Sequence, residues 1–190
     1  MKALVLSGGS GTRLHPLPVN SPEQPHPAAD KPVLFHALED IADAGITDVG
    51  IVLGDTADEV RAAVGDGARF GVSVTYLPRR RPAGLAHAVR TARDWLGDDD
   101  FVTHPGDGFV PGGIGEQLEE FRSRRPVAQE VPGRAGVYFF TDAVHRAVEA
   151  VQPSGHGELE ITEVLRWLTG QGLEVVSGTA GDHDEAQIAS

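Results

Sequence analysis

The sequence predicts an α/β domain built on an open, mostly parallel sheet. Short apolar runs alternate with segments of helical periodicity through the first half of the chain. A glycine-rich turn, residues 7–14, comes directly after the first apolar run. The chain has 190 residues, 40% of them apolar, which is enough for one buried core and makes a second domain unexpected.

The first half of the chain carries the clearest elements. Residues 3–6 are a short apolar run that stops at glycine, as a buried parallel strand does. Leu34, Leu38 and Ile41 fall at helical spacing, and Gly45 ends that helix. We expect further strands at 49–53, at 72–77 and from 101 toward Gly106, helices at 33–44 and 85–96, a helix capped by Asp55 and Thr56, and a long loop over the six prolines of 15–32.

The second half is less regular. Apolar periodicity predicts helices at 114–124, 142–151 and 161–168, and strands at 137–140 and 173–176. The tail from Thr179 is small and polar. Without an internal repeat or a linker, residues 1–190 are expected to form a single domain.

Composition limits the function. The net charge of -12 argues against nucleic acid or an anionic membrane surface as the main partner. The absence of cysteine excludes disulfides and thiolate chemistry. The first apolar run is too short for a signal peptide, and no stretch approaches the length of a membrane span, so a cytoplasmic location is expected.

The glycine-rich turn is the strongest local signal. Gly8, Gly9 and Gly11 let the backbone approach a ligand and point several N–H groups into one concavity, which suits a phosphate. Thr12 and Arg13 follow, and the guanidinium adds a permanently charged donor for the same anion. Such turns also serve only to pack a strand against a helix, but the acidic residue at a later strand end, Asp107, favours a phosphate site.

At these residues the sequence resembles the glucose-1-phosphate thymidylyltransferases, a family of sugar-1-phosphate nucleotidyltransferases. The similarity covers most of the chain, in the family's order. The matching segments are 1–14, 31–44, 45–53, 65–67, 70–71, 84–86, 106–107, 136–140 and 157–162.

The resemblance implies a Rossmann-like fold with helices on both faces of the sheet, and an enzyme that joins a nucleoside triphosphate to a sugar 1-phosphate and releases pyrophosphate. In the family the glycine turn cradles the triphosphate, and the arginine matching Arg13 stabilises the transferred phosphoryl group. Aspartates matching Asp107 and Asp182 hold Mg²⁺. This division of labour fits the chemistry, because nucleotidyl transfer depends mostly on positioning and charge neutralisation.

The resemblance also assigns the remaining ligand contacts. Segments matching Gly84 and Leu85, and the strand with Tyr138, touch the base and the sugar, while the glutamate matching Glu158 binds sugar hydroxyls. Arg79 stands where the family has a base-reading glutamine; an arginine still meets carbonyl oxygens but lacks the paired donor and acceptor of an amide. A solvated basic turn is the competing interpretation of Arg79. A homo-oligomer is implied as well.

Several departures argue against full activity. Glu23 aligns with a lysine that contacts the phosphates in the family, so a cation is replaced by an anion. Two unit charges about 4 Å apart, at an effective dielectric near 20, interact by about 4 kcal/mol before screening, so a bound triphosphate would be repelled there. His104 and Pro105 replace an apolar pair, and Gly108 replaces an asparagine. The sugar-binding half, 126–190, is truncated relative to the nucleotide-binding half, 1–125. Its segment 126–135 stands in for several dozen residues of the family and holds Arg134 but no lysine.

Three functions remain open. The leading hypothesis is that the fold serves a different small-molecule reaction, in secondary metabolism, on a nucleotide, a sugar phosphate or a pathway metabolite. The second is retained thymidylyl transfer with Mg²⁺, the only cofactor considered, and the third is a non-catalytic ligand-binding or partner subunit. The acid–base groups of the leading hypothesis are Glu23, His104, Asp107 and Glu158.

Overall fold

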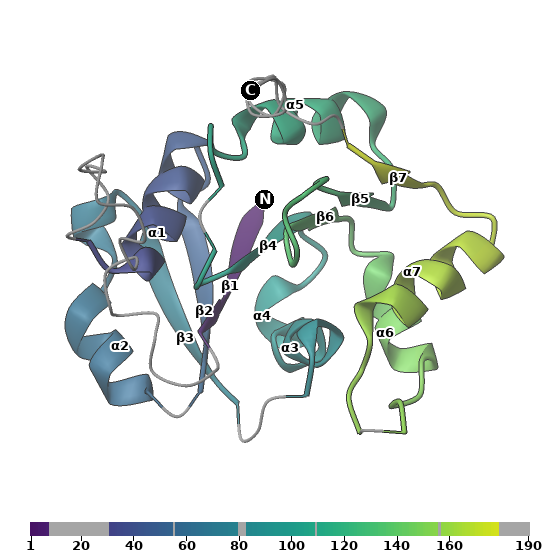
Figure 1. Ribbon diagram of the computed structural model, residues 1–190, viewed down its shortest axis with the longest axis horizontal. Coiled ribbons are helices and arrows are strands. Elements are labelled where there is room, and N and C mark those ends of the chain that lie inside the picture. Colours follow the sequence, from purple (N-terminus) through teal and green to yellow (C-terminus); the bar gives the residue numbers. More distant parts are fainter. Residues whose placement is uncertain (8–30, 55, 80–82, 109, 156, 179–190) are drawn as a thin grey trace, which may run out of the picture.

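A computed structural model describes residues 1–7, 31–54, 56–79, 83–108, 110–155 and 157–178. One mixed sheet is made of β1 (Lys2–Ser7), β2 (Asp48–Leu53), β3 (Ser73–Pro78), β4 (Phe101–Pro105), β5 (Ala128–Glu130), β6 (Tyr138–Phe140) and β7 (Val175–Ser177). The strand order is β3-β2-β1-β4-β6-β5-β7 (Figure 1). The β3, β2, β1 and β4 strands are mutually parallel, and β7 is parallel to β5, whereas β6 runs antiparallel to β4 and β5. The predicted open, mostly parallel sheet is confirmed.

Helices cover both faces of this sheet (Figure 1). They are α1 (Val33–Asp43), α2 (Ala57–Val64), the short 3-10 helix η2 (Ala68–Phe70), α3 (Leu85–Thr91), α4 (Arg93–Leu96), α5 (Gly115–Arg124), α6 (Val144–Ala150) and α7 (Ile161–Gly170). The α1, α2 and α5 helices pack on one face, and α3, α4, α6 and α7 pack on the other. Among the described residues, no helix combines the length and the apolar content needed to cross a membrane.

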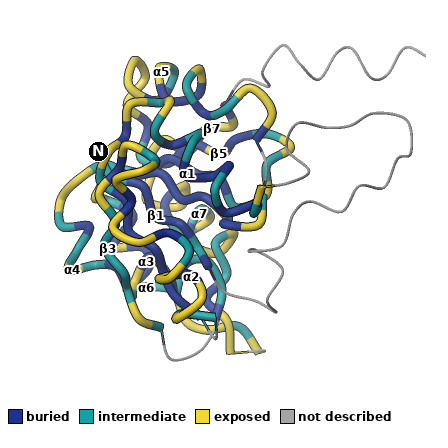
Figure 2. Tube along the Cα trace, turned by 90° about the vertical axis from the view of Figure 1, so that its left-hand side faces the viewer, coloured by how far each residue is buried: buried dark blue, intermediate teal, exposed yellow. Residues whose placement is uncertain are grey.

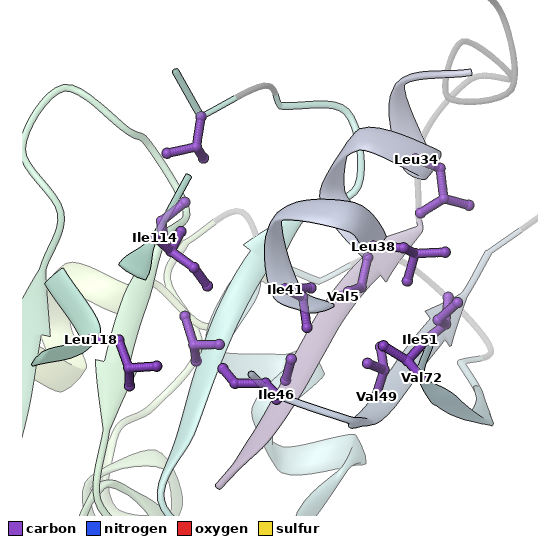
Figure 3. Close-up of a cluster of buried hydrophobic side chains, with 14 of the residues drawn as sticks. Val5, Leu34, Leu38, Ile41, Ile46, Val49, Ile51, Val72, Ile114 and Leu118 are labelled. Carbon is purple, nitrogen blue, oxygen red and sulfur yellow. The ribbon is translucent and has the colours of Figure 1, made fainter. Parts of the chain in front are cut away.

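The core has two layers because strand side chains alternate between the faces. Val5 belongs to the cluster under α1, whereas its neighbour Leu4 belongs to the cluster under α3 and α6. Leu38 and Ile41 of α1 point toward β1 and β2 and are fully buried (Figure 3). Burying each such side chain contributes about 1.5–3 kcal/mol. Figure 2 shows the buried trace concentrated along the central strands and the exposed trace in the outer turns.

Three local features differ from the predictions. The helix expected over 85–96 is broken at Ala92, although Ala88, Ala92 and Leu96 are all buried and keep the helical pattern across the break. Thr56 precedes α2 but its side chain caps no backbone N–H. The β5 strand was not expected, because its central residue Gln129 is polar yet fully buried.

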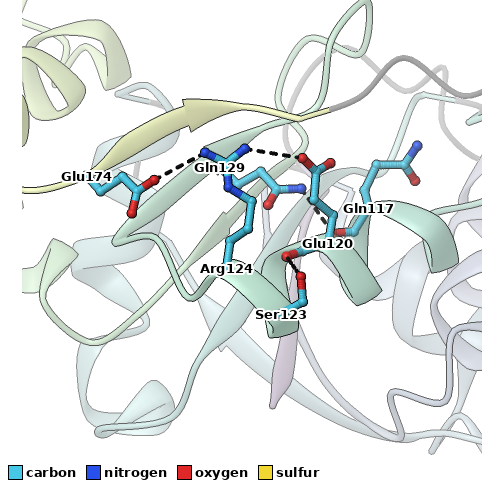
Figure 4. Close-up of polar contacts among 6 residues, drawn as sticks. All are labelled: Gln117, Glu120, Ser123, Arg124, Gln129 and Glu174. Carbon is cyan, nitrogen blue, oxygen red and sulfur yellow. Dashed lines mark hydrogen bonds and ion pairs between the residues drawn. The ribbon is translucent and has the colours of Figure 1, made fainter.

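Polar contacts fix α5 against β5 and β7 (Figure 4). Gln129 Nε2 donates to the Gln117 carbonyl at 3.0 Å, inside the protein. At the surface, Arg124 bridges Glu120 at 3.5 Å and Glu174 at 3.2 Å. Half-exposed ion pairs contribute only about 0–1 kcal/mol each, so the buried Gln129 bond is the more specific anchor of this short strand.

Candidate functional site

The carboxyl edge of the parallel strands is the expected place for a site. From β1 the sheet continues through β2 and β3 on one side, and through β4 and β6 on the other. Ligands of open α/β sheets bind outside the carboxyl ends of the strands at such a reversal of strand order. The glycine-rich segment follows β1 in the sequence, Arg79 follows β3 and Asp107 follows β4, so three predicted site segments leave the sheet at one edge.

A tight turn after β4 presents Asp107. Gly106 N donates to Leu6 O at 3.0 Å, and Gly108 N donates to Pro105 O at 3.2 Å. A Cβ atom on Gly106 would lie 2.8 Å from Leu6 O, so only glycine allows this approach to β1. Gly106 is buried beneath the turn, and Asp107 is exposed above it.

A second contact joins two segments that are far apart in the sequence. Leu159 N donates to Ala83 O at 3.1 Å, and Leu159 is 1% exposed. Gly84 has φ +85°, and a Cβ atom there would lie 2.6 Å from Leu159 O. Leu85, at the start of α3, therefore lies near the segment that carries Glu158, whose side chain is exposed.

Arg79 extends this second contact. Its Nη1 donates a long hydrogen bond, 3.5 Å, to Gly84 O, and the side chain is half-buried. The structure thus brings Arg79, Gly84 and the Glu158 segment together, as the assignment of base and sugar contacts requires. Their roles toward a ligand stay predictions.

Tyr138 is held inside the sheet. Its N–H donates to Thr103 Oγ1 at 3.2 Å, and Thr103 Oγ1 donates to Gly136 O at 2.9 Å. The phenol donates to Glu130 Oε1 at 3.3 Å, and the residue is only 7% exposed. Burial, and then the Glu130 charge, raise the pKa of Tyr138, so the phenol is neutral. Thr103 was not singled out by sequence, since a buried threonine in an apolar strand gives no local signal.

His104 lies in the core. The residue is 0% exposed and lies opposite Val5 in the β1–β4 register. Burial lowers the pKa of His104, against the hydrogen bond to Pro105 and the charge of Asp107, which raise it. Nδ1 lies 2.8 Å from Pro105 O and must carry the proton, while Nε2 is buried without a hydrogen-bond partner. A neutral, enclosed imidazole gives no support to the acid–base role predicted for His104.

The rest of the predicted site lies outside the described residues. These positions are Gly8, Gly9, Gly11, Thr12, Arg13, Glu23 and Asp182. Within the described ranges, no three His, Asp or Glu side chains gather into a metal-binding group. Magnesium often takes only one or two protein carboxylates and completes its shell with water and substrate phosphates, so the exposed Asp107 carboxylate fits that use.

Comparison with known proteins decides the family. Residues 2–131 match the family model described as nucleotidyl transferase. The chain belongs to the nucleotidyl transferase family. The glucose-1-phosphate thymidylyltransferase of Streptomyces griseus is 47% identical over 211 residues, covering 93% of this chain and 59% of that protein. The enzyme of the same name from Mycolicibacterium smegmatis is 32% identical, covering 95% of this chain and 76% of that protein.

Solved structures show the same fold. A Bacillus anthracis protein assigned as a glucose-1-phosphate thymidylyltransferase, in complex with sucrose, matches with a TM-score of 0.74 and 25% identity over 94% of this chain and 87% of that one. A UDP-glucose pyrophosphorylase complexed with UDP-glucose matches with a TM-score of 0.70 at 17% identity, covering 94% of this chain and 91% of that one, which shows the fold alone.

The chain spans only part of the length of the relatives that it matches. It spans 59% and 60% of the length of the Streptomyces griseus and Streptomyces antibioticus thymidylyltransferases. The alignments run over 211 and 212 residues, more than the 190 of the chain, so the aligned part of each relative contains residues that this chain lacks. The predicted shortening is therefore confirmed.

The chain also carries a carboxylate with an unusual pKa that was not among the predicted site residues. Asp40 of α1 lines a cavity of about 340 Å³ with the 110–115 loop. Burial raises the pKa of Asp40 from 3.8 to about 6, against the charge of His36, which lowers it. Sequence reasoning missed Asp40 because it occupies an ordinary polar position on an amphipathic helix.

Asp40→Asn is expected to stabilise the chain above pH 7 and not at pH 4. The folded state favours the protonated carboxyl, so its contribution to stability is full below the ordinary pKa of 3.8 and is lost as pH rises through about 6. Since Asp40 is half-exposed, we expect a gain of about 1 kcal/mol at pH 7.5. Urea unfolding of both proteins at pH 4 and pH 7.5 measures it; an equal difference at both pH values contradicts the shift.

Proposed function

We propose that the chain transfers a nucleotidyl group from a pyrimidine nucleoside triphosphate, dTTP first, to a sugar 1-phosphate and releases pyrophosphate. The observation that carries the proposal is the common edge at which the glycine-rich segment, Arg79 and Asp107 leave parallel strands. The identity of 47% and 48% with two thymidylyltransferases supports dTTP. In this proposal residues 1–125 bind the nucleotide and 126–190 bind the sugar phosphate, within one domain.

The reaction needs no proton acceptor. An ionised oxygen of the sugar phosphate forms a bond to the α-phosphorus of the triphosphate as the bond from that phosphorus to the α–β bridging oxygen breaks, and pyrophosphate leaves. The buried, neutral His104 is therefore compatible with this chemistry, whereas a proton-transfer reaction would need an accessible group in its place.

The proposal keeps the roles that the family resemblance assigns. The glycine-rich segment and Arg13 hold the triphosphate, and Asp107, with Asp182, would hold Mg²⁺. When bound, the ion would neutralise phosphate charge and align the two substrates. Arg79, Gly84 and Leu85 bind the base, and Glu158 accepts hydrogen bonds from sugar hydroxyls.

A changed reaction has less support. That hypothesis depended on four acid–base groups, and one of them, His104, is enclosed in the core. A non-catalytic role would not require Gly106 and Gly84 to keep the close approaches that hold the Asp107 turn and the Glu158 segment in place.

Pyrophosphate release tests the proposal. Purified protein is incubated with glucose 1-phosphate and dTTP or UTP, with and without Mg²⁺. We expect release with dTTP that disappears in EDTA and when the sugar phosphate is omitted, because both the charge neutralisation and the acceptor are required. Absence of release above background with both nucleotides in Mg²⁺ would rule the function out.

A further inference from the structure

The pairing of β4 with β6 stops at a proline. Thr103 lies opposite Tyr138 in this antiparallel pair. The same register carries Pro105 to the position opposite Gly136, and the Pro105 ring does lie there, 3.5 Å from the place of a Cβ atom on Gly136. Because proline has no backbone N–H, Pro105 cannot donate the next hydrogen bond of the ladder.

A side-chain hydroxyl supplies the missing donor. Thr103 Oγ1 donates to Gly136 O at 2.9 Å and accepts from Tyr138 N at 3.2 Å. Gly136 O and Tyr138 N, which are two residues apart, therefore both point toward β4, as in a continuous antiparallel ladder. Thr103 is 0% exposed, so removing its hydroxyl would withdraw a partner from two backbone groups at a position that water does not reach.

These two hydrogen bonds join segments that enclose one cavity. The β5–β6 connection and the turn after β4 form a cavity of about 200 Å³, lined by residues of both segments, Arg134 and Pro105 among them. Thr103 lies in β4 just before the turn, and its hydroxyl holds Gly136 at the end of the connection. The hydroxyl therefore fixes the spacing between the β5–β6 connection and the turn that presents Asp107.

We propose that Thr103 is a positioning residue that compensates for Pro105 and holds the start of β6 against the Asp107 turn, an inference that rests on the proposed function. In that function β6 belongs to the half that binds the sugar phosphate, whereas the segment that holds the triphosphate follows β1. Since β1 and β6 border β4 on opposite sides (Figure 1), loss of the hydroxyl should affect the sugar 1-phosphate and spare the nucleotide. Thr103 acts in this role through the backbone of Gly136 and Tyr138, without touching either substrate.

Steady-state kinetics test the role. Thr103→Val keeps the shape of the side chain without its hydroxyl, and should raise the KM for glucose 1-phosphate at least about fivefold while the KM for dTTP stays within about twofold. Thr103→Ser keeps the hydroxyl and should bring the KM for glucose 1-phosphate back to within about twofold. Val49→Ala is the control, because it weakens the buried core at the start of β2, away from β6, and should change neither KM. An unchanged KM in Thr103→Val, or an equal rise in Val49→Ala, would overturn the inference.

A double-mutant cycle tests the compensation for Pro105 and needs no turnover. Thr103→Val loses two hydrogen bonds and should lower the urea midpoint of unfolding by about 1 M. Pro105→Ala returns a backbone N–H opposite Gly136, so in that background Thr103→Val should cost about half as much. Equal costs in the two backgrounds contradict the compensation, and so does failure of both Thr103→Val and the double variant to fold.

A binding measurement separates this inference from the proposed function. Calorimetric titration with glucose 1-phosphate is applied to the unmodified chain, Thr103→Val and Thr103→Ser. If the unmodified chain releases no pyrophosphate yet binds glucose 1-phosphate, and only Thr103→Val binds it at least about fivefold more weakly, the function fails and the positioning role stands. If pyrophosphate is released and Thr103→Val binds as the unmodified chain does, the function stands and the role fails. Absence of binding by the unmodified chain also overturns the role.

Discussion

Asp107→Asn is expected to reduce pyrophosphate release by about 10³-fold while leaving the fold intact. The carboxylate is exposed at the end of β4, so asparagine fits the same space. The substitution removes the negative charge that a divalent cation requires, and charge neutralisation is the main contribution to phosphoryl-group transfer. The turn itself depends on the backbone bonds of Gly106 and Gly108, which the variant keeps.

The measurement is kcat with saturating dTTP and glucose 1-phosphate over a range of Mg²⁺ concentrations. Asp94→Asn is the matched control, because Asp94 is also exposed but lies on α4, which precedes β4 and so lies at the opposite edge of the sheet. The control should retain full activity. If Asp107→Asn kept more than about a tenth of the activity, Asp107 would not be the metal ligand, and the edge after β4 would lose its assigned role.

The parallel half of the sheet could be predicted because its signals are local. The β1 and β2 strands carry continuous apolar runs, and β4 begins with the apolar pair Phe101 and Val102, as expected of strands that are covered on both faces. The amphipathic pattern of α1 likewise predicts which side of the helix is buried, and Leu34, Leu38 and Ile41 all face the sheet (Figure 3). The short connections between the elements from α1 to β4 then leave few topologies to consider.

The other half of the sheet depends on contacts between distant residues, which no local sequence pattern predicts. Gln129 occupies the centre of β5 because the Gln117 carbonyl accepts its amide, and those residues come from different elements. The position of Arg134 could not be predicted for the same reason, because the cavity that it lines is formed by the β5–β6 connection together with the Pro105 turn. His104 was misleading in the opposite direction, because a histidine at a strand end resembles a site residue until its side-chain direction is known.

The sequence predicted which segments form the candidate site, but it did not predict how those segments are arranged in space. The sequence indicated Gly84 and the Glu158 segment separately, through the family resemblance. What joins them is a backbone approach: Leu159 N donates to Ala83 O, and Leu159 is buried in the core under α3 and α6. The only sequence signal of such a close backbone approach is a glycine. Glycine also occurs in turns, bulges and helix ends that bring no distant segment close, so the signal is not specific.

Gly84→Ala should test this approach through both stability and activity. Gly84 has φ +85° and ψ 173°, a backbone conformation that is essentially restricted to glycine, and its new Cβ atom would lie 2.6 Å from Leu159 O. Backbone strain of about 1–3 kcal/mol adds to the cost of moving the buried Leu159, so we expect a loss of at least about 3 kcal/mol in the free energy of unfolding. Because the displaced segment carries Glu158, the KM for the sugar phosphate should rise as well.

Gly45→Ala is the control that separates the steric clash of an added Cβ atom from the backbone strain of a positive φ angle. Gly45 also has positive φ, +77°, but nothing lies within 4 Å of the Cβ atom that alanine would add. That variant should lose only about 1 kcal/mol and keep both KM values, since it carries strain alone and ends a helix away from the Glu158 segment. Urea unfolding gives the two free energies under one set of conditions. Equal losses in the two variants would mean that the contact between Gly84 and Leu159 can relax, and that the Glu158 segment is not held in place by it.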